Sequence, residues 1–241
     1  MAPRIDVSAD PAALAHRVAQ WIVDLACTAP GRFAIALSGG STPRRLYQLL
    51  AAAPLRDQMP WSRVHIFWGD DRFVPWDSPD SNYAMAREAM LAHVPIPPDN
   101  VHGIPYGADI AAAARAYERT LKTYYGADVL DPARPLFDIN LLGMGPDGHT
   151  ASLFPGKPAL AEDRRWVVEV PEPGLPPLVP RVTLTYPALN SARSVAFIAA
   201  GADKMAMMRR VLRGDRELPS ARIAPVGELI WFVDRAANGE P

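Results

Sequence analysis

The stretch FDINLLGMGPDGHTASLFPG (residues 137–156) joins a short apolar run to a loop with four glycines, one aspartate and one histidine. Residues 137–142 have the length and composition of a buried strand. Residues 143–148 also spell GxGxxG, the pattern of dinucleotide-binding loops. That pattern needs a long helix directly after it, and Pro155-Gly156 would end any helix within about two turns. A dinucleotide site would also leave Asp147 and His149 without a role, so we disfavour it.

Asp147 and His149 indicate acid–base chemistry instead. Histidine is the usual general base near neutral pH, and a carboxylate two residues away can orient it. Lone histidines are commonly structural. We favour the catalytic interpretation here because the histidine lies in a glycine-rich loop at the end of a strand.

Similar apolar runs occur on both sides of this stretch and alternate with helical patterns. Further strands are predicted at residues 33–37, 64–68, 166–170, 182–185, 195–199 and 229–233. Helices are predicted from Pro11 with Asp10 as N-cap, from Pro43, over 82–92, over 110–125, and over 203–213 with an end at Gly214. The alternation predicts an α/β, Rossmann-like fold, with a mostly parallel sheet and helices on both faces.

No linker divides the chain. The best candidate, PEPGLPPLVP (171–180), is too short to be more than a loop, so residues 1–241 are expected to form a single domain. The formal net charge of −1 gives no reason to expect nucleic acid or an anionic membrane as partner. No run of about 18 apolar residues and no apolar signal core are present. With a single cysteine, Cys27, an internal disulfide is impossible, and a reducing compartment such as the cytoplasm is expected. We also expect a monomer.

Other catalytic classes lack their motifs. The five histidines are scattered (16, 65, 93, 102 and 149), and no pair has the spacing of zinc ligands, so no metal site is predicted. No GxSxG elbow of a serine hydrolase occurs. We therefore expect chemistry without a metal or an organic cofactor.

Two further predicted strands also end in polar loops, SGGST (38–42) and GDDR (69–72). Because the carboxyl ends of parallel strands share one edge of a sheet, both loops should meet residues 143–149 there. SGGST stands before a helix and can bind phosphate through backbone N–H groups and hydroxyls; the alternative is an ordinary turn with Thr42 as N-cap. In GDDR, the fork of Arg72 suits a phosphate or an oxyanion, although a solvated charged turn is the other interpretation.

Together these motifs resemble the 6-phosphogluconolactonase family, which belongs with the glucosamine-6-phosphate deaminases and isomerases. The resemblance covers nearly the whole chain. It rests on ALSGGSTP (36–43), WGDDRFVP (68–75), DSN (80–82), LLGMGPDGHTASLFPG (141–156), PRVTLT (180–185) and GADK (201–204). It implies hydrolysis of 6-phospho-D-glucono-1,5-lactone to 6-phospho-D-gluconate, the second step of the oxidative pentose phosphate pathway.

The resemblance also implies roles for individual residues. His149 matches the general base and Asp147 stands beside it. Asp70 and Arg72 match the acidic and basic members of the second motif, with Asp70 as the next candidate for the base. The phosphate ligands implied are Ser38, Gly39, Gly40, Ser41, Thr42 and Lys204, with Arg181 near the sugar phosphate. Whether Arg72 contacts the phosphate or the carbonyl oxygen stays open.

Two alternatives are weaker. Deaminases resemble this chain through the histidine but then read roughly HIAFNEP, and Phe154 stands in the place of their glutamate. The second alternative is a non-catalytic sugar-phosphate-binding regulator. That function does not need His149 and usually comes with a DNA-binding module, of which the sequence shows no sign.

Overall fold

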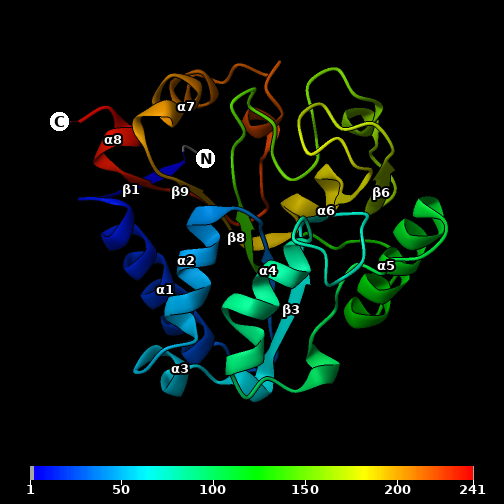
Figure 1. Cartoon of the computed structure of the whole chain (residues 1–241), viewed down its shortest axis with the longest axis horizontal. Coiled ribbons are helices and arrows are strands. Elements are labelled where there is room, and N and C mark those ends of the chain that lie inside the picture. Colours follow the sequence, from blue (N-terminus) through cyan, green and yellow to red (C-terminus); the bar gives the residue numbers. More distant parts are fainter. Residues whose placement is uncertain (1–2, 241) are drawn as a thin grey trace.

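A six-stranded parallel sheet forms the centre of the computed structural model, which describes residues 3–240 (Figure 1). The strand order is β1-β9-β8-β5-β2-β3, and every neighbouring pair is parallel. The strands are β1 (Arg4–Ser8), β2 (Phe33–Leu37), β3 (Val64–Trp68), β5 (Phe137–Leu142), β8 (Ala192–Ala199) and β9 (Glu228–Asp234). The predicted Rossmann-like α/β fold is therefore confirmed.

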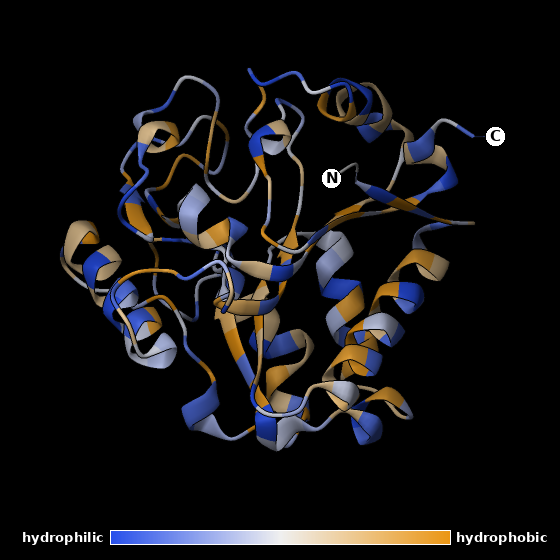
Figure 2. Cartoon of the chain, turned by 180° about the vertical axis from the view of Figure 1, so that it is seen from behind, coloured by the Kyte–Doolittle hydropathy of each residue, from blue (hydrophilic) through white to orange (hydrophobic). Residues whose placement is uncertain are grey.

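Helices flank this sheet, and Figure 2 shows them banded by hydrophobic and hydrophilic residues, as amphipathic helices are. They are α1 (Pro11–Thr28), α2 (Ser41–Leu50), α3 (Leu55–Gln58), α4 (Asn82–Ala89), α5 (Ile110–Tyr125), α6 (Tyr186–Asn190), α7 (Met205–Leu212) and α8 (Arg235–Asn238). No helix within residues 3–240 is long and apolar enough to cross a membrane.

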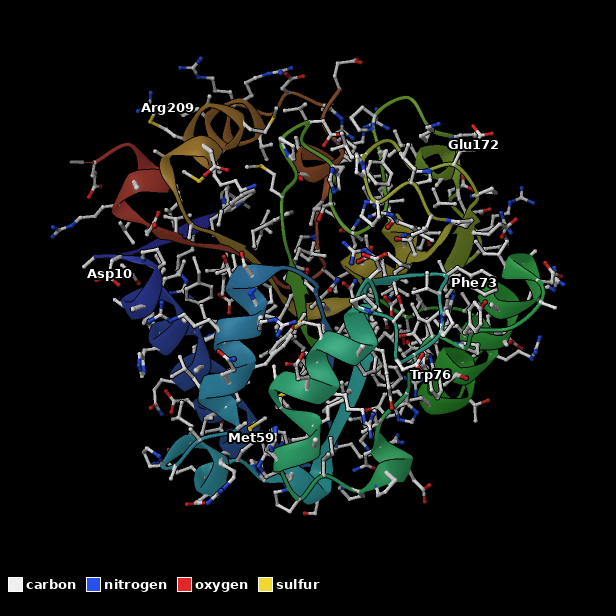
Figure 3. All side chains as sticks on the ribbon, in the orientation of Figure 1. Asp10, Met59, Phe73, Trp76, Glu172 and Arg209 are labelled. Carbon is white, nitrogen blue, oxygen red and sulfur yellow. The ribbon has the colours of Figure 1, made fainter. Side chains whose placement is uncertain are left out.

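The predicted helix boundaries were right in part. Asp10, labelled in Figure 3 at the start of α1, caps that helix by accepting hydrogen bonds from the N–H groups of Ala12 (2.7 Å) and Ala13 (2.9 Å). Helix α2 begins at Ser41 rather than at Pro43, since proline fits anywhere in a first turn, and its N-cap is Gly40 rather than Thr42. The helix predicted over 82–92 ends at Ala89.

The single helix predicted over residues 203–213 is two elements in the structure. A short 3₁₀ turn, Ala202–Lys204, precedes α7. The predicted end at Gly214 is confirmed, because this glycine has a left-handed φ of 80° and its N–H bonds to the Val211 carbonyl. Lys204 therefore stands at the junction between the 3₁₀ turn and the helix.

A second, antiparallel sheet was not foreseen. Its order is β4 (Asp70–Arg72), β7 (Arg181–Leu184) and β6 (Val167–Val170). The chain changes sheets at Gly69, whose N–H bonds to Leu37 in the large sheet while its carbonyl accepts from Leu184 in the small one. The segment GDDR is thus a three-residue strand and not only a loop. Its register places Arg72 directly opposite Arg181.

The edge strand β1 was also missed. Its two apolar residues, Ile5 and Val7, alternate with polar ones and are exposed, so they do not form a buried apolar run. Near the other edge, the buried hydroxyl of Tyr117 on α5 bonds to both the N–H (2.8 Å) and the carbonyl (2.9 Å) of Trp68. Tyr117 therefore fixes the last residue of β3, next to the point where the chain leaves the large sheet.

Two histidines meet on the outer side of β3. Nδ1 of His65 lies 3.1 Å from Nε2 of His102, and the ring of Phe67 stacks on His102 with centroids 4.4 Å apart. Burial, and secondarily the neighbouring His65, lowers the pKa of His102 from 6.5 to about 4. The unfolded chain therefore binds this proton more readily than the folded chain does.

We expect His102 to make the protein acid-sensitive. Its contribution to stability is complete above pH 6.5 and is lost as the pH falls toward 4. Allowing for solvent screening of a partly buried ring, the loss is on the order of 1–2 kcal/mol. Urea unfolding of wild type and His102→Gln at pH 7 and pH 4.5 measures it. His16→Gln, an exposed histidine of α1, is the control. Equal pH sensitivity of wild type and His102→Gln would contradict this assignment.

Candidate active site

A polar cavity of about 180 Å³ opens at the carboxyl ends of β2, β3 and β5, where the three predicted loops meet. It is lined by Ser38, Gly39, Gly40, Asp70, Arg72, Asn82, Gly143, Met144, Gly145, His149, Ala151 and Arg181. A larger hollow of about 260 Å³ lies beside Lys157 and Glu172, of which Figure 3 labels Glu172, but its lining is mostly apolar and contains no histidine. The polar cavity is the candidate active site because the three loops meet there and because His149, Arg72 and Arg181 line it.

Asp147 and His149 form a hydrogen-bonded pair in the third loop. Nδ1 of His149 lies 2.5 Å from Oδ1 of Asp147, and the same oxygen accepts from the His149 backbone N–H at 3.1 Å. A carboxylate can only accept, so Nδ1 carries the proton and Nε2 of the neutral ring is free to act as a base. His149 lines the cavity, whereas Asp147 is not part of its lining and contacts the imidazole at Nδ1.

The glycine of this loop that matters most is Gly145. A Cβ atom added there would lie 2.1 Å from both Nδ1 and Cε1 of His149, so no larger residue fits. The loop closes on itself through bonds from Gly145 N–H to the His149 carbonyl (2.9 Å) and from Gly148 N–H to the Gly145 carbonyl (3.1 Å). The next helical turn is Pro158–Ala161, so no long helix follows the GxGxxG pattern.

The chain then turns sharply at Ala151, the one non-glycine residue within residues 3–240 that has a positive φ (48°). Strained backbone of this kind is often found at functional sites. The turn places Ala151 in the cavity wall and directs the next side chain toward the second loop, because Ser152 Oγ donates to Asp70 Oδ2 at 2.6 Å. The second and third loops are thereby joined.

Two arginines supply the positive charge of the cavity. Arg72 donates to the Asp80 carbonyl at 2.6 Å, and Arg181 donates to the carbonyls of Leu175 (3.0 Å) and Pro177 (3.1 Å). Their Nε atoms are buried and have no hydrogen-bond partner within residues 3–240. Burial lowers the pKa of Arg181, with Arg72 adding to the effect and Asp70 opposing it, but a guanidinium remains protonated. Arg181 is buried and Arg72 is partly buried, and free donors on two such cations are suited to an anionic ligand.

The first loop is held by a buried tyrosine. The hydroxyl of Tyr47 accepts from the Ser38 N–H at 3.0 Å and donates to the Ser38 carbonyl at 2.8 Å. Gly40 then opens α2, and the N–H groups in the first turn of a helix have no acceptor within it. Ser38, Gly39 and Gly40 line the cavity, as expected for a phosphate loop.

Three other predicted ligands lie beside the cavity rather than in its wall. Ser41 and Thr42 belong to the first turn of α2. Lys204 is behind the third loop, where its Nζ donates to the Met144 carbonyl at 3.3 Å. They adjoin residues that do line the cavity, since Ser41 and Thr42 directly follow Gly40 and Lys204 contacts Met144.

Asn82 lines the cavity and was not among the predicted site residues, although it belongs to the motif DSN. Its Nδ2 donates to the Asp70 carbonyl at 3.0 Å, and its Oδ1 would lie 2.0 Å from a Cβ added at Gly39. Asn82 therefore sets the spacing of the first two loops. Asp71 positions it by accepting from the Asn82 N–H at 2.6 Å; burial raises the pKa of Asp71 to about 6, while this and other N–H donors oppose the rise.

Comparisons with known proteins agree with these motifs. The family model described as glucosamine-6-phosphate isomerases/6-phosphogluconolactonase matches residues 9–231. A 6-phosphogluconolactonase of Nostoc sp. is 42% identical over 248 residues, which cover 100% of this chain and 99% of the relative. The structure of 6-phosphogluconolactonase from Thermotoga maritima is similar with a TM-score of 0.82 and 31% identity, covering 96% and 99% of the two chains. A monomeric glucosamine-6-phosphate deaminase, covering 98% and 99%, has a TM-score of 0.81 but only 20% identity, which shows a shared fold alone.

We expect Tyr47→Phe to destabilise the protein by about 1–3 kcal/mol, since both backbone groups of Ser38 lose their partner in a buried place. Urea unfolding at pH 7 measures this. The control is Tyr124→Phe, because the Tyr124 hydroxyl has no hydrogen bond among those found within residues 3–240. A loss no larger than that of the control would mean that Tyr47 does not hold the first loop.

Proposed function

The chain belongs to the family of glucosamine-6-phosphate isomerases and 6-phosphogluconolactonases, and we propose that the polar cavity is its active site. The reaction is the hydrolysis of 6-phospho-D-glucono-1,5-lactone to 6-phospho-D-gluconate. One observation carries the assignment of the site: the Asp147–His149 pair, held at 2.5 Å, lies at a cavity that is also lined by two arginines, Arg72 and Arg181.

The proposed reaction begins with water. Nε2 of His149 takes a proton from a water molecule, and the oxygen of that water attacks the lactone carbonyl carbon. The ring C–O bond of the resulting tetrahedral intermediate then breaks, and His149 returns the proton to the departing ring oxygen, which becomes a hydroxyl group. Asp147 keeps the imidazole in the required tautomer and stabilises its charged form. Water and lactone together give the open-chain acid, so the atoms balance.

Negative charge is present on the substrate phosphate and develops on the carbonyl oxygen. Arg72 and Arg181 face each other across β4 and β7 and supply positive charge for these two groups. A kinetic separation distinguishes their roles: loss of transition-state charge stabilisation lowers kcat, whereas loss of phosphate binding raises KM. Asp70, bonded to Ser152, is the candidate to act as base if His149 is not.

The phosphate is proposed to bind at the first loop. Ser38, Gly39 and Gly40 line the cavity ahead of α2, whose N-terminus attracts an anion. Ser41, Thr42 and Lys204 would complete the site. Binding of the phosphate, which does not react, orients the lactone carbonyl toward His149.

The two rival functions fit less well. An aromatic ring, Phe154, packs against His149 with centroids 4.5 Å apart, in the place where the resemblance puts the carboxylate of a deaminase. A binding protein without catalysis would not need the Asp147–His149 pair. Release of ammonia from glucosamine 6-phosphate would favour the first rival over the lactonase.

Other properties are proposed on narrower grounds. We propose that residues 1–241 form one domain, because β1 near the start of the chain and β9 near its end pair in the same sheet. Cytoplasmic location is proposed from the single, exposed and unpaired Cys27. We also propose that the enzyme acts as a monomer, since the chain by itself supplies a base, two arginines and a glycine loop for the reaction.

Replacement of the base should separate catalysis from binding. His149→Ala is expected to lower kcat by roughly 10²–10⁴-fold while binding of 6-phosphogluconate persists. Asp147→Asn should have a smaller effect. Lactone hydrolysis above the spontaneous rate, together with calorimetry of product binding, measures both quantities, and His16→Ala is the control. A near-normal kcat in His149→Ala would mean that His149 is not the general base, and Asp70 would then be the candidate.

The phosphate site predicts a preference for the phosphorylated lactone. Losing the charged donor in Lys204→Ala should cost about 1.5–3 kcal/mol, which raises KM by roughly 10- to 150-fold for the phosphorylated lactone alone. The comparison uses phosphorylated and unphosphorylated gluconolactone, with Lys157→Ala as the control lysine. Equal efficiency of the wild type on both lactones would show that no phosphate site exists.

Metal independence is the last prediction from this site. Within residues 3–240, no group of three or more histidine, cysteine, aspartate or glutamate residues is placed to hold a metal ion. Activity should therefore survive dialysis against EDTA. A loss that zinc, magnesium or manganese restores would contradict the mechanism.

A further inference from the structure

Phe154 is a fully buried ring that touches two members of the cavity without lining it. Its centroid lies 4.5 Å from that of His149, with the ring planes inclined at 37°. The guanidinium carbon of Arg181 lies over the same ring, 5.2 Å from its centroid. A single side chain thus contacts both the base and one of the cations.

The proline-rich loop 171–180 encloses this arrangement. The carbonyls of Leu175 and Pro177 accept the two hydrogen bonds of Arg181 at 3.0 and 3.1 Å. A Cβ atom added at Gly174 would lie 2.9 Å from Cδ1 of Phe154, so the loop backbone packs directly on the ring. The loop therefore holds the arginine by hydrogen bonds and the phenylalanine by packing.

Asp147 alone does not fix the orientation of the His149 ring, and packing against Phe154 does. A hydrogen bond to Nδ1 fixes the tautomer of His149, but by itself it permits the imidazole plane to rotate about the bond. A close aromatic ring limits that rotation. Being apolar, it also offers no acceptor that could compete with Asp147 for the imidazole proton. Small errors in the direction of Nε2 are costly, because a displacement of about 1 Å can lower a rate by 10²-fold.

We propose that Phe154 is a positioning residue for His149, and that loop 171–180 holds Phe154 by packing while it holds Arg181 separately through the carbonyls of Leu175 and Pro177. This inference rests on the proposed role of His149. Phe154 itself does not touch the substrate, and it acts only through the imidazole that it orients.

The test is a double-mutant cycle of Phe154→Leu with His149→Ala, measured as lactone hydrolysis above the spontaneous rate. In the wild-type background Phe154→Leu should lower kcat by roughly 10- to 100-fold and leave KM and product binding unchanged. In the His149→Ala background it should lower kcat by less than about twofold, since the residue it orients is gone. A purely structural role would give the same fold-loss in both backgrounds, which would overturn the proposal.

Two further variants keep the result interpretable if Phe154→Leu folds poorly. Gly174→Ala alters an exposed backbone position and should push on the ring, lowering kcat with KM unchanged. Phe137→Leu, the same substitution at a buried site at the start of β5, is the control and should leave kcat within about twofold of wild type. A normal kcat in Gly174→Ala, or an equal loss in Phe137→Leu, would also overturn the inference.

Failure of this inference is distinct from failure of the proposed function. The proposed function depends on hydrolysis by the wild type and its loss in His149→Ala. The position of the imidazole can be followed without turnover, because the Phe154 ring current shifts the His149 ring protons in NMR spectra. That shift should disappear in Phe154→Leu and change in Gly174→Ala, and an unchanged shift would contradict the packing proposed here.

Discussion

The contact between His149 Nδ1 and Asp147 Oδ1, at 2.5 Å, is possible only because the loop around it has no side chain at Gly145. The imidazole occupies the space that a Cβ atom at that position would fill. The short loop can therefore present Nε2 to the cavity with its tautomer already set. Phe154 then contributes what a hydrogen bond cannot, which is resistance to rotation of the ring. The base is therefore oriented both by its hydrogen bond to Asp147 and by the packing of the loop around it.

The two sheets have different tasks in this arrangement. The parallel sheet brings three loops to one edge, as any parallel sheet does with loops that follow its strands. The small antiparallel sheet adds what that edge lacks, since its register places Arg72 opposite Arg181. Gly69 connects the two sheets by bonding to both. An acid–base loop and a cationic wall thus meet at one cavity although they belong to different sheets.

The features of this protein that depend on local sequence pattern could be predicted from the sequence alone. It predicted the parallel sheet, the helix cap at Asp10 and the meeting of the three loops, because apolar runs and glycine-rich strand ends are visible along the chain. It did not foresee the strand at Asp70–Arg72, which is too short and too charged to show a period of two. Tyr47 and Asn82 were missed as supports of the site because their partners are fixed by the fold. Phe154 was noted only as a departure from a related motif.

The central claim is that the glycine-rich loop exists to hold His149 against Asp147 over the substrate, and Gly145→Ala tests it most directly. The added methyl group would occupy the place of the imidazole and leave the first loop and both arginines untouched. Stopped-flow hydrolysis of freshly generated 6-phospho-D-glucono-1,5-lactone, with calorimetry of product binding, is the measurement. The account predicts a kcat reduced by roughly 10²-fold or more with product affinity retained. A Gly145→Ala enzyme with wild-type kcat would contradict it.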